Sequence, residues 1–387
     1  MTRFILYIFS FFIPLNGFIN ATTGLKIAPL FAALLLITRL LHTSKITFSK
    51  TFFIIFFCFI LIFIMQTFRE YNSLILALSF TYYLMIGLIF STYSNKRYLD
   101  IFYKGFLHGV IFICLIFVFS LFNGGVTNSI IEWQFGLPVN ISGMQNPNGW
   151  APFLILAISA NDYIYLGRKQ RNRFFNIHFI SQILILTALV FTYSRAAILC
   201  VIAYYLIIYF KSLMKRPILI SFFIIVTFGG MSINSFDSSN EERGSVISNK
   251  EGSIDVRTDV IKAVADLPWN QVLIGNGYGT SQVLIEQRIG FPVSLHNVYL
   301  ATLVELGALQ FLLLLIICAY PFATAMTHKR NLSYVKSRHK YILVGIFVSL
   351  LYWMFHESHI NTAFWGFYFC LLQQMSYSEK SYNYKDE

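Results

Sequence analysis

Long apolar stretches separated by short polar connections constrain this chain more than any other feature of its sequence. Each stretch comes near the ~20 residues that an α-helix needs to cross about 30 Å of hydrocarbon. Within a bilayer only helices and closed barrels satisfy every backbone group, and runs of this length indicate helices. The sequence therefore predicts an all-α integral membrane protein with about twelve transmembrane helices. The stretches lie at 4–19, 27–41, 51–66, 73–91, 105–122, 150–166, 177–192, 196–213, 217–234, 297–320, 341–355 and 361–375.

Composition excludes an ordinary soluble protein. Of the 387 residues, 57% are hydrophobic and only 12% are charged, whereas soluble domains carry about 25% charged residues. The first stretch follows Arg3 and resembles a secretory signal, but the many later stretches favour an uncleaved first helix. The five cysteines lie inside apolar stretches and form no CxxC pair, which argues against redox or zinc chemistry.

The net charge of +12 comes from Lys and Arg residues that gather in short loops. Such spacing indicates membrane orientation and not a nucleic-acid partner. When the N-terminus is placed in the cytoplasm, most of these cations fall in inner loops, and the outer short loops hold only Lys26, Arg69 and Arg195. The positive-inside rule then predicts a multi-pass protein with both termini in the cytoplasm.

Two predicted outer connections, at 123–149 and 235–295, are much longer than the rest. Loops of more than about 12–15 residues are usually functional or disordered. In the second, Ser253 is positioned to cap a helix that places Val256, Val260 and Val264 on one face and ends before Pro268, and a further short helix is predicted at 281–288. The predicted organisation is 1–234 for the first nine spans, 235–295 for a large structured external loop, 296–375 for the last three spans and 376–387 for a cytoplasmic tail.

Arg195 lies between two apolar stretches, directly after Ser194. Ser194 is a suitable N-cap for the following helix. The free N–H groups of a helix start, the positive end of its dipole and a guanidinium would together suit an anion such as phosphate. The alternative interpretation is an interfacial arginine whose side chain extends to lipid headgroups.

Other polar residues on the predicted outer side are candidates for a site. Arg257 lies on the predicted helix of the large loop, where it is either a surface cation or an anion ligand. His296 precedes Asn297 at the start of a span, so it is either a helix-terminal hydrogen-bonding group or a general base that is neutral at pH 7. Glu305 would lie deeper, as a structural hydrogen-bonding group, the partner of an arginine or a functional carboxylate.

The segment His356-Glu357-Ser358-His359 connects the last two spans and contains two potential metal ligands. It lacks the H-E-x-x-H spacing, so interfacial capping is the favoured interpretation. No outer loop holds an Asp-x-Asp or a tight acidic cluster. We therefore expect no bound metal and no cofactor.

Several of these segments together resemble the bacterial O-antigen ligase and O-antigen polymerase superfamily, over about residues 140–375. Their order, spacing and predicted membrane side all agree with that family. The matching segments are GMQNPNG at 143–149, TYSRA at 192–196, Arg257 followed by LIGNGYG at 273–279, and HNVYL at 296–300 followed by ELG at 305–307.

The resemblance implies a metal-independent, inverting glycosyltransferase at the periplasmic face of the bacterial cytoplasmic (inner) membrane. Its donor would be a polyprenyl-diphosphate-linked oligosaccharide and its acceptor a glycan lipid, with a chain-length regulator as a candidate further partner. Arg195 and Arg257 match the arginines that the family uses on the donor diphosphate, and His296 matches its general base. Arg288, Asn297 and Glu357 are weaker candidates for substrate contacts.

Three functions remain open on the sequence. The leading one is a polymerase of surface polysaccharide (O-antigen or capsule) that moves the growing chain onto a new lipid-linked repeat unit. The Asn146-Pro147-Asn148 segment and the modest length of the chain favour it. The second is a ligase that moves the finished glycan to lipid A–core. The third is a lipid-linked oligosaccharide flippase, which the sparse mid-membrane charge disfavours.

Overall fold

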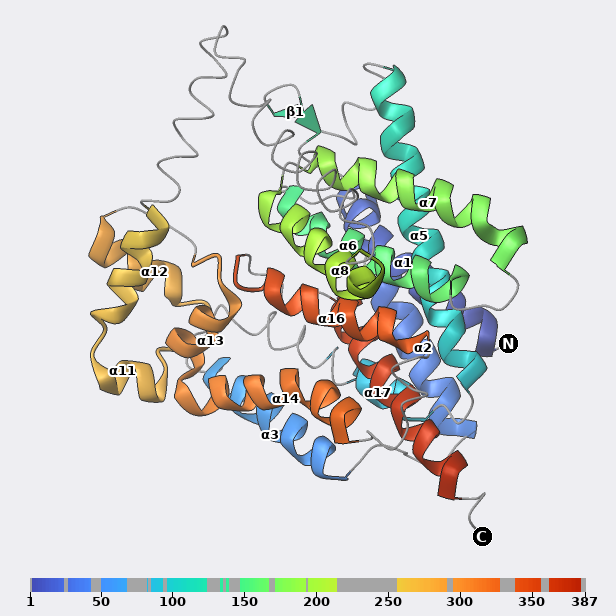
Figure 1. The fold of residues 1–387 in the computed structure, drawn as a ribbon. Helices are drawn as coiled ribbons and strands as arrows, with labels where there is room; N and C mark the ends of the chain where they lie inside the picture. Colours follow the sequence, from blue (N-terminus) through green and yellow to red (C-terminus); the bar gives the residue numbers. More distant parts are fainter. Residues whose placement is uncertain are drawn as a thin grey trace, which may run out of the picture.

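The computed structural model describes residues 2–23, 27–42, 50–67, 82, 85–92, 96–123, 133–134, 137–138, 147–166, 171–192, 194–213, 256–290, 295–327, 338–355 and 362–383. Apart from two short strands, the regular structure of these residues is helical (Figure 1). The strands are β1 (Trp133–Gln134) and β2 (Leu137–Pro138), which pair antiparallel. Residues 85–91 and 256–265 are also helical. The remaining helices are α1 (Thr2–Thr23), α2 (Ile27–His42), α3 (Lys50–Thr67), α5 (Lys96–Asn123), α6 (Pro147–Tyr165), α7 (Arg171–Phe191), α8 (Arg195–Leu213), α11 (Trp269–Ile274), α12 (Ser281–Ile289), α13 (Val298–Leu306), α14 (Ala308–Thr327), α16 (His339–Tyr352) and α17 (Thr362–Asn383).

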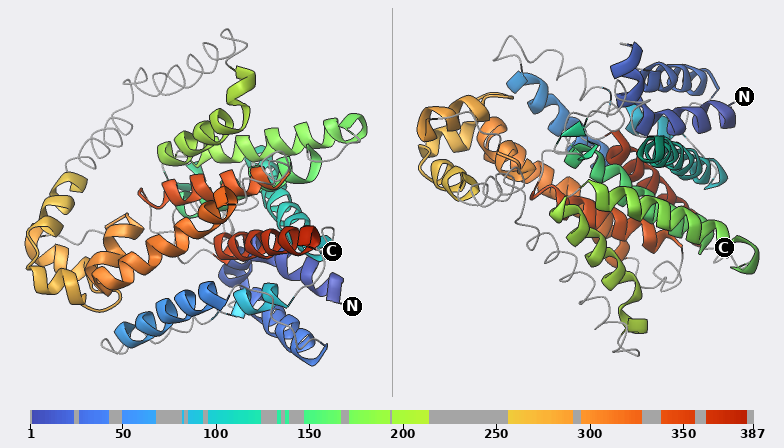
Figure 2. Two further views of the ribbon diagram at one scale, coloured as in Figure 1. Left: turned by 60° about the horizontal axis from the view of Figure 1, so that its bottom comes forward. Right: turned by 90° about the horizontal axis from the view of Figure 1, so that it is seen from above.

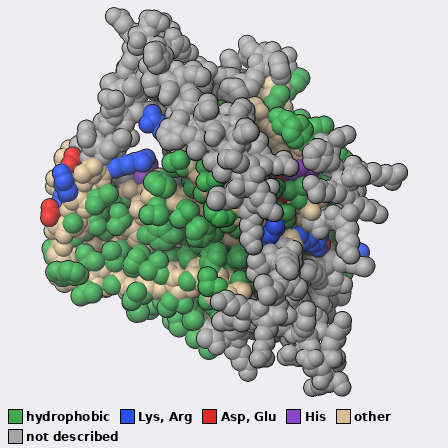
Figure 3. Space-filling model, viewed as in Figure 1, with side chains coloured by type: hydrophobic (Ala, Val, Ile, Leu, Met, Phe, Trp, Pro, Cys, Tyr) green, Lys and Arg blue, Asp and Glu red, His purple; other side chains and the backbone are tan. Residues whose placement is uncertain are grey.

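The helices have the composition of membrane spans. Within the described residues, Tyr98–Phe119 and Ala308–Met326 are long and apolar enough to cross a bilayer. Large apolar side chains cover much of the outer surface, which appears as wide green areas in Figure 3; a soluble monomer rarely exposes patches of that size. These observations are consistent with an all-α membrane protein. The number of membrane spans stays a prediction. Shorter apolar helices occupy Thr2–Asn16, Ile27–Leu41, Phe52–Met65, Ile177–Val190, Arg195–Phe210 and His339–Tyr352.

Helix α5 packs parallel to α1 through two glycines. Near the start of both helices, Arg3 lies over the ring of Tyr98. Further along both, Tyr7 hydrogen-bonds to His108, so the two helices run in the same direction. A Cβ atom at Gly105 or Gly109 would overlap backbone oxygens of α1. Small residues four apart permit this close approach, and dispersion contacts between backbones hold helices together where the solvent is lipid.

The other main pairs run antiparallel. Ser159 of α6 meets Gly345 of α16, and the C-terminal end of α6 lies beside the N-terminal end of α16, where Arg338 stacks on the ring of Tyr163. Helices α3 and α14 are likewise antiparallel, since the Gln310 amide donates to the Phe59 carbonyl and Phe52 packs on Tyr320. These relative directions agree with a chain that crosses a layer alternately, while the compartment that each end faces stays a prediction.

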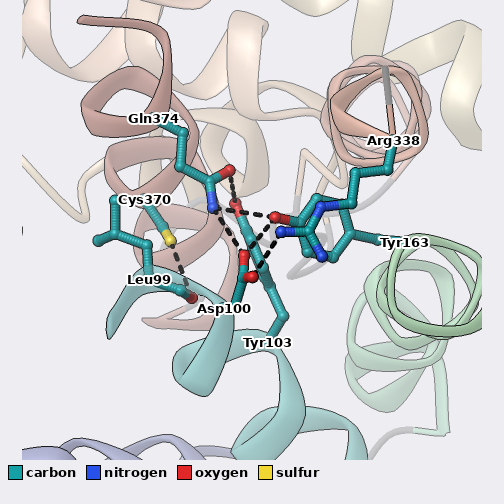
Figure 4. A network of polar contacts seen from close by, with 7 residues as sticks. All are labelled: Leu99, Asp100, Tyr103, Tyr163, Arg338, Cys370 and Gln374. Carbon is teal, nitrogen blue, oxygen red and sulfur yellow. Dashed lines mark hydrogen bonds and ion pairs between the residues drawn. The ribbon is translucent and has the colours of Figure 1, made fainter. Parts of the chain in front are cut away.

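A half-buried polar cluster joins the ends of four helices (Figure 4). The carboxylate of Asp100 accepts hydrogen bonds from the Tyr163 hydroxyl and from the Arg338 guanidinium, each at 2.5 Å. The Gln374 amide donates to the Tyr163 hydroxyl at 3.1 Å. Because α5, α6, α16 and α17 each contribute, this Asp100 cluster fixes their ends against one another. Helix α17 continues to Asn383, beyond the predicted end of its span at residue 375.

The described part of the large loop, residues 256–290, forms a small unit with its own apolar core. Helices α11 and α12 lie at the side of the molecule opposite the start of α1 and the end of α17 (Figures 1 and 2). The unit packs on α13, so its core is shared with the helix that follows it. Its buried apolar residues are Val260, Ala263, Val264, Leu267, Ile285, Leu295, Ala301 and Val304.

The predicted span 297–320 is divided into α13 and α14 at Gly307, whose φ is 89°. The backbone of Gly275, with φ of 81°, packs directly against the backbone of Gly307. A Cβ atom on Gly275 would come within 2.6 Å of the Glu305 carbonyl oxygen. The Asn276 and Gly277 N–H groups donate to the carbonyls of Val304 and Glu305 at 3.1 and 2.9 Å. The glycine-rich turn thus satisfies carbonyls that the end of α13 leaves open.

Candidate functional site

Helix α8 begins at the predicted anion-binding position. Ser194 is buried, and its Oγ accepts a hydrogen bond from the Ala197 N–H at 3.4 Å. This contact confirms the predicted N-cap. Arg195, the first residue of the helix, is exposed. Its guanidinium is therefore free to reach a ligand at the positive end of the helix dipole.

Tyr352, the last residue of α16, links the start of α8 to the large loop. Its hydroxyl lies 3.3 Å from Ser194 Oγ. It also lies close enough to Arg257 for an electrostatic interaction between the guanidinium and the phenol. Arg257 is exposed on the 256–265 helix. The two predicted arginines come from far-apart segments. Arg195 follows the residue that Tyr352 contacts, and Arg257 lies within electrostatic range of the same tyrosine.

His296 comes to the same helix end. It lies in the segment between the large loop and α13, and the Val298 N–H two residues later donates to the Trp353 carbonyl at 2.9 Å. The half-buried His296 has φ of 46° and is the one non-glycine residue with positive φ among those described. Such a backbone is uncommon outside glycine, although His tolerates it better than most residues. Residues held this way cluster at functional sites.

The start of α8, which carries Arg195, and the segment that holds His296 thus meet the C-terminal end of α16, and Arg257 lies within electrostatic range of it. We call this end of α16 the site end. It lies at the opposite end of α16 from the Asp100 cluster, because Arg338 precedes that helix and Tyr352 ends it. In Figure 3 blue Lys or Arg side chains lie next to a purple His side chain, above the green apolar surface. Two cations and an imidazole at the rim of an apolar layer can bind a dianionic lipid headgroup and accept a proton.

Asn297 has a structural task at this site. Its Oδ1 accepts hydrogen bonds from the N–H groups of Tyr299 and Leu300, at 3.0 and 3.1 Å, and so caps α13. The capping oxygen is therefore engaged, and a substrate contact by this side chain would fall to the amide NH₂ group.

Two further candidates are held by the loop unit. The Arg288 guanidinium donates to the Asp266 carbonyl at 3.1 Å, which ties the end of α12 to the end of the 256–265 helix. The buried Glu305 accepts hydrogen bonds from the N–H and the hydroxyl of Ser281 at the start of α12. Glu305 thus makes a structural hydrogen bond, one of the alternatives predicted for it. Glu357, His356 and His359 lie outside the described residues.

The sequence did not single out Tyr352. It ends an apolar stretch, and tyrosines are common at the ends of membrane spans because their rings suit the interface. Only the tertiary contact with Ser194 and the electrostatic influence of Arg257 distinguish it from other tyrosines of this kind. Within the described residues no group of three or more His, Cys, Asp or Glu is arranged to hold a metal ion.

Residues 180–315 match the model of the O-antigen ligase family. The match supports the O-antigen ligase and polymerase superfamily. It includes Arg195, Arg257, His296 and the loop unit that places Arg257 at the site end. A comparison with curated proteins gives no match. Glycan-processing chemistry of the O-antigen ligase or polymerase kind is therefore supported, without a distinction between the two.

The two tasks open to Asn297 can be separated by substitution. Asn297→Ala should lower the free energy of unfolding by about 0.5–2 kcal/mol, because it removes the N-cap of α13. Asn297→Asp keeps a capping oxygen and should restore stability. If Asn297→Asp also restores transfer activity, the residue acts as a cap alone; if it restores stability but not activity, the amide NH₂ contacts substrate. Thermal unfolding in detergent and a transfer assay on each variant measure both.

Proposed function

We propose that this protein is a polymerase of bacterial surface polysaccharide, O-antigen or capsule. It would transfer a glycan from a polyprenyl-diphosphate-linked donor to a lipid-linked repeat unit, on the periplasmic face of the inner membrane. The observation that supports the proposal is that the start of α8, which carries Arg195, and the segment that holds His296 meet at the site end of α16, with Arg257 within electrostatic range of Tyr352 there. The family match supports the class of chemistry.

The arginines would bind the donor diphosphate. Each guanidinium offers a planar pair of N–H donors that match phosphate oxygens, and both side chains are exposed. The start of α8 adds N–H groups and the positive end of its dipole. As the bond to the sugar breaks, negative charge grows on the diphosphate, so these groups stabilise the transition state more than the ground state. They would take the place of a metal ion.

His296 would act as the general base. The acceptor hydroxyl gives its proton to the imidazole as its oxygen attacks the anomeric carbon. A new carbon–oxygen bond forms, the bond from that carbon to the diphosphate breaks, and polyprenyl diphosphate leaves with the electron pair. In-line attack inverts the anomeric configuration. The partly buried position of His296 and its unusual backbone would hold the imidazole in one orientation.

The alternative within the superfamily is a ligase that transfers the finished glycan to lipid A–core. The same arginines and histidine would serve it, since only the acceptor differs. A flippase is a third hypothesis from another class, and it would need cations along a cavity through the membrane. Of these, the polymerase remains our proposal because of the Asn146-Pro147-Asn148 segment. A chain-length regulator would be a further partner.

Deletion of the gene distinguishes the three functions on a gel of surface glycan. Loss of a polymerase should leave core carrying one repeat unit, because ligation continues without elongation. Bare core together with lipid-linked polymer would instead show a ligase. Repeat units trapped on the cytoplasmic side would show a flippase, and either of these outcomes would contradict the proposal.

Substitutions at the site should separate chemistry from folding. His296→Asn removes the base but keeps a residue that tolerates positive φ, and it should lower the transfer rate on the order of 10²–10⁴-fold. Arg195→Lys should impair donor binding because a planar fork is lost, and Arg257→Ala should do the same. Transfer by purified variants in detergent, together with their abundance in the membrane, is the measurement.

Matched controls make the outcome specific. Lys262→Ala removes an exposed cation from the same helix as Arg257 and should leave activity unchanged. If His296→Asn transfers normally while His296→Ala does not, the backbone conformation matters and the base assignment is wrong. If all three site variants are poorly expressed, these residues serve folding, and the active site must be sought elsewhere in the protein.

Tyr352 would act as a positioning residue for the arginines. Tyr352→Phe removes a hydroxyl that touches Ser194, a contact worth about 0.5–1.5 kcal/mol, so KM for the donor should rise by at most about 12-fold. The kcat should change less, because the proton transfer to His296 is untouched. Ser194→Ala added to Tyr352→Phe should cost less than the two single changes together. An equal fall in kcat with an unchanged KM would contradict this role.

A further inference from the structure

Helix α11 presents large apolar side chains to the outside. Trp269 is 80% exposed, and Leu273 and Ile274 are each 57% exposed. No residue of this helix is buried. The helix therefore contributes little to the core of the loop unit, and it carries none of the proposed site residues Arg195, Arg257 and His296. In water, such a set of side chains would be costly to expose.

The backbone fixes where α11 lies relative to the layer. Its C-terminal Ile274 and the following Gly275 pack against Gly307, immediately before α14 begins. Because α14 is long and apolar enough to cross a bilayer, its first residues mark the depth at which the apolar layer ends. Helix α11 is thus held at that depth by backbone contacts and not by flexible side chains.

The apolar surface of α14 continues onto the loop unit. Leu309 and Leu312, near the start of α14, are 62% and 54% exposed. In Figure 3 the green area over α14 extends to the lower left of the view, where α11 lies in Figure 1, whereas red and blue side chains gather higher on the same side. Asp259 and Lys262 are exposed on the 256–265 helix. The unit therefore has one apolar side and one charged side.

We propose that α11 lies in the interfacial region of the bilayer, on the leaflet at the site end, with lipid as its partner. Trp269 would sit at the level of the headgroups, the position that tryptophan prefers in membranes, and Leu273 and Ile274 would contact acyl chains. The arrangement corresponds to an amphipathic element lying in the membrane plane. The proposal rests on the apolar surface and on the position of α11, and it does not depend on glycan transfer.

This contact would set the height of Arg257. The 256–265 helix shares its apolar core with α12 and α13, and the turn after α11 is hydrogen-bonded to the end of α13. Anchoring of α11 in the interface therefore limits tilting of the whole unit. Arg257 would be kept at the level where the headgroup of a membrane lipid lies, beside Tyr352.

Tryptophan quenching by brominated lipid tests the contact. The protein is placed as single copies in nanodiscs, and the spectrum of Trp269→Phe is subtracted from that of the native chain, which isolates Trp269 from the other four of the five tryptophans. We expect blue-shifted emission that bromine near the top of the acyl chain quenches strongly and aqueous iodide quenches weakly. Strong iodide quenching without bromolipid quenching would place Trp269 in water and overturn the proposal.

Paired substitutions in the loop unit complete the test. Leu273→Glu adds a charge on the apolar side and should abolish most of the bromolipid quenching of Trp269. Ala265→Glu adds the same charge at an exposed position of the 256–265 helix, next to the charged side that holds Lys262, and should leave the quenching largely intact. If Trp269 is protected from iodide when several copies share one liposome, but is open to iodide and not quenched by bromolipid in the single-copy nanodiscs, a second copy of the chain covers α11 and the lipid proposal fails.

Discussion

Backbone hydrogen bonding at the break between α13 and α14 determines how the large loop is attached. A helix that ends within or near the apolar layer leaves carbonyls that water does not reach, and each unsatisfied group there is costly. Asn276 and Gly277 satisfy those of Val304 and Glu305. Only glycine at 275 and 307 allows the two backbones to come so close. The LIGNGYG segment at 273–279 thus attaches the large loop to the end of α13, and the position of Arg257 depends on this attachment.

The two ends of α16 have different roles, one in holding helices together and one at the candidate site. At its start, Arg338 and Asp100 form a half-buried ion pair supported by Tyr163 and Gln374, so these charges have partners inside the protein. At its other end, the Tyr352 hydroxyl lies 3.3 Å from Ser194 Oγ, and the side chains of Arg195 and Arg257 are exposed. Charges that are mutually satisfied stabilise a fixed arrangement of helices, whereas exposed cations of one sign around a helix start remain available to an anionic ligand.

The apolar stretches and caps could be predicted because they depend on local chemistry. Ser194 caps α8 as its residue type suggests, and α13 begins after Asn297. Tyr352, α11 and the break at Gly307 could not be predicted. The break lies inside a stretch that is apolar on both sides of Gly307, and it exists because a turn some thirty residues earlier supplies its hydrogen bonds. Helix α11 is too short for a periodic signal, and Tyr352 acquires its place only through tertiary contacts.

Neighbouring residues around His296 have different roles, which follow from the hydrogen bonds that their side chains already make. Asn297 uses its oxygen to cap α13 and Arg288 donates to the Asp266 carbonyl, so both support the frame around His296. That frame holds His296 with a positive φ, a conformation that a flexible loop would relax. Arg195 and Arg257, by contrast, extend from helices whose positions are fixed by Ser194 and by the loop core. A diphosphate bound between them would be met by rigidly placed charges, and this preorganisation is what electrostatic catalysis without a metal requires.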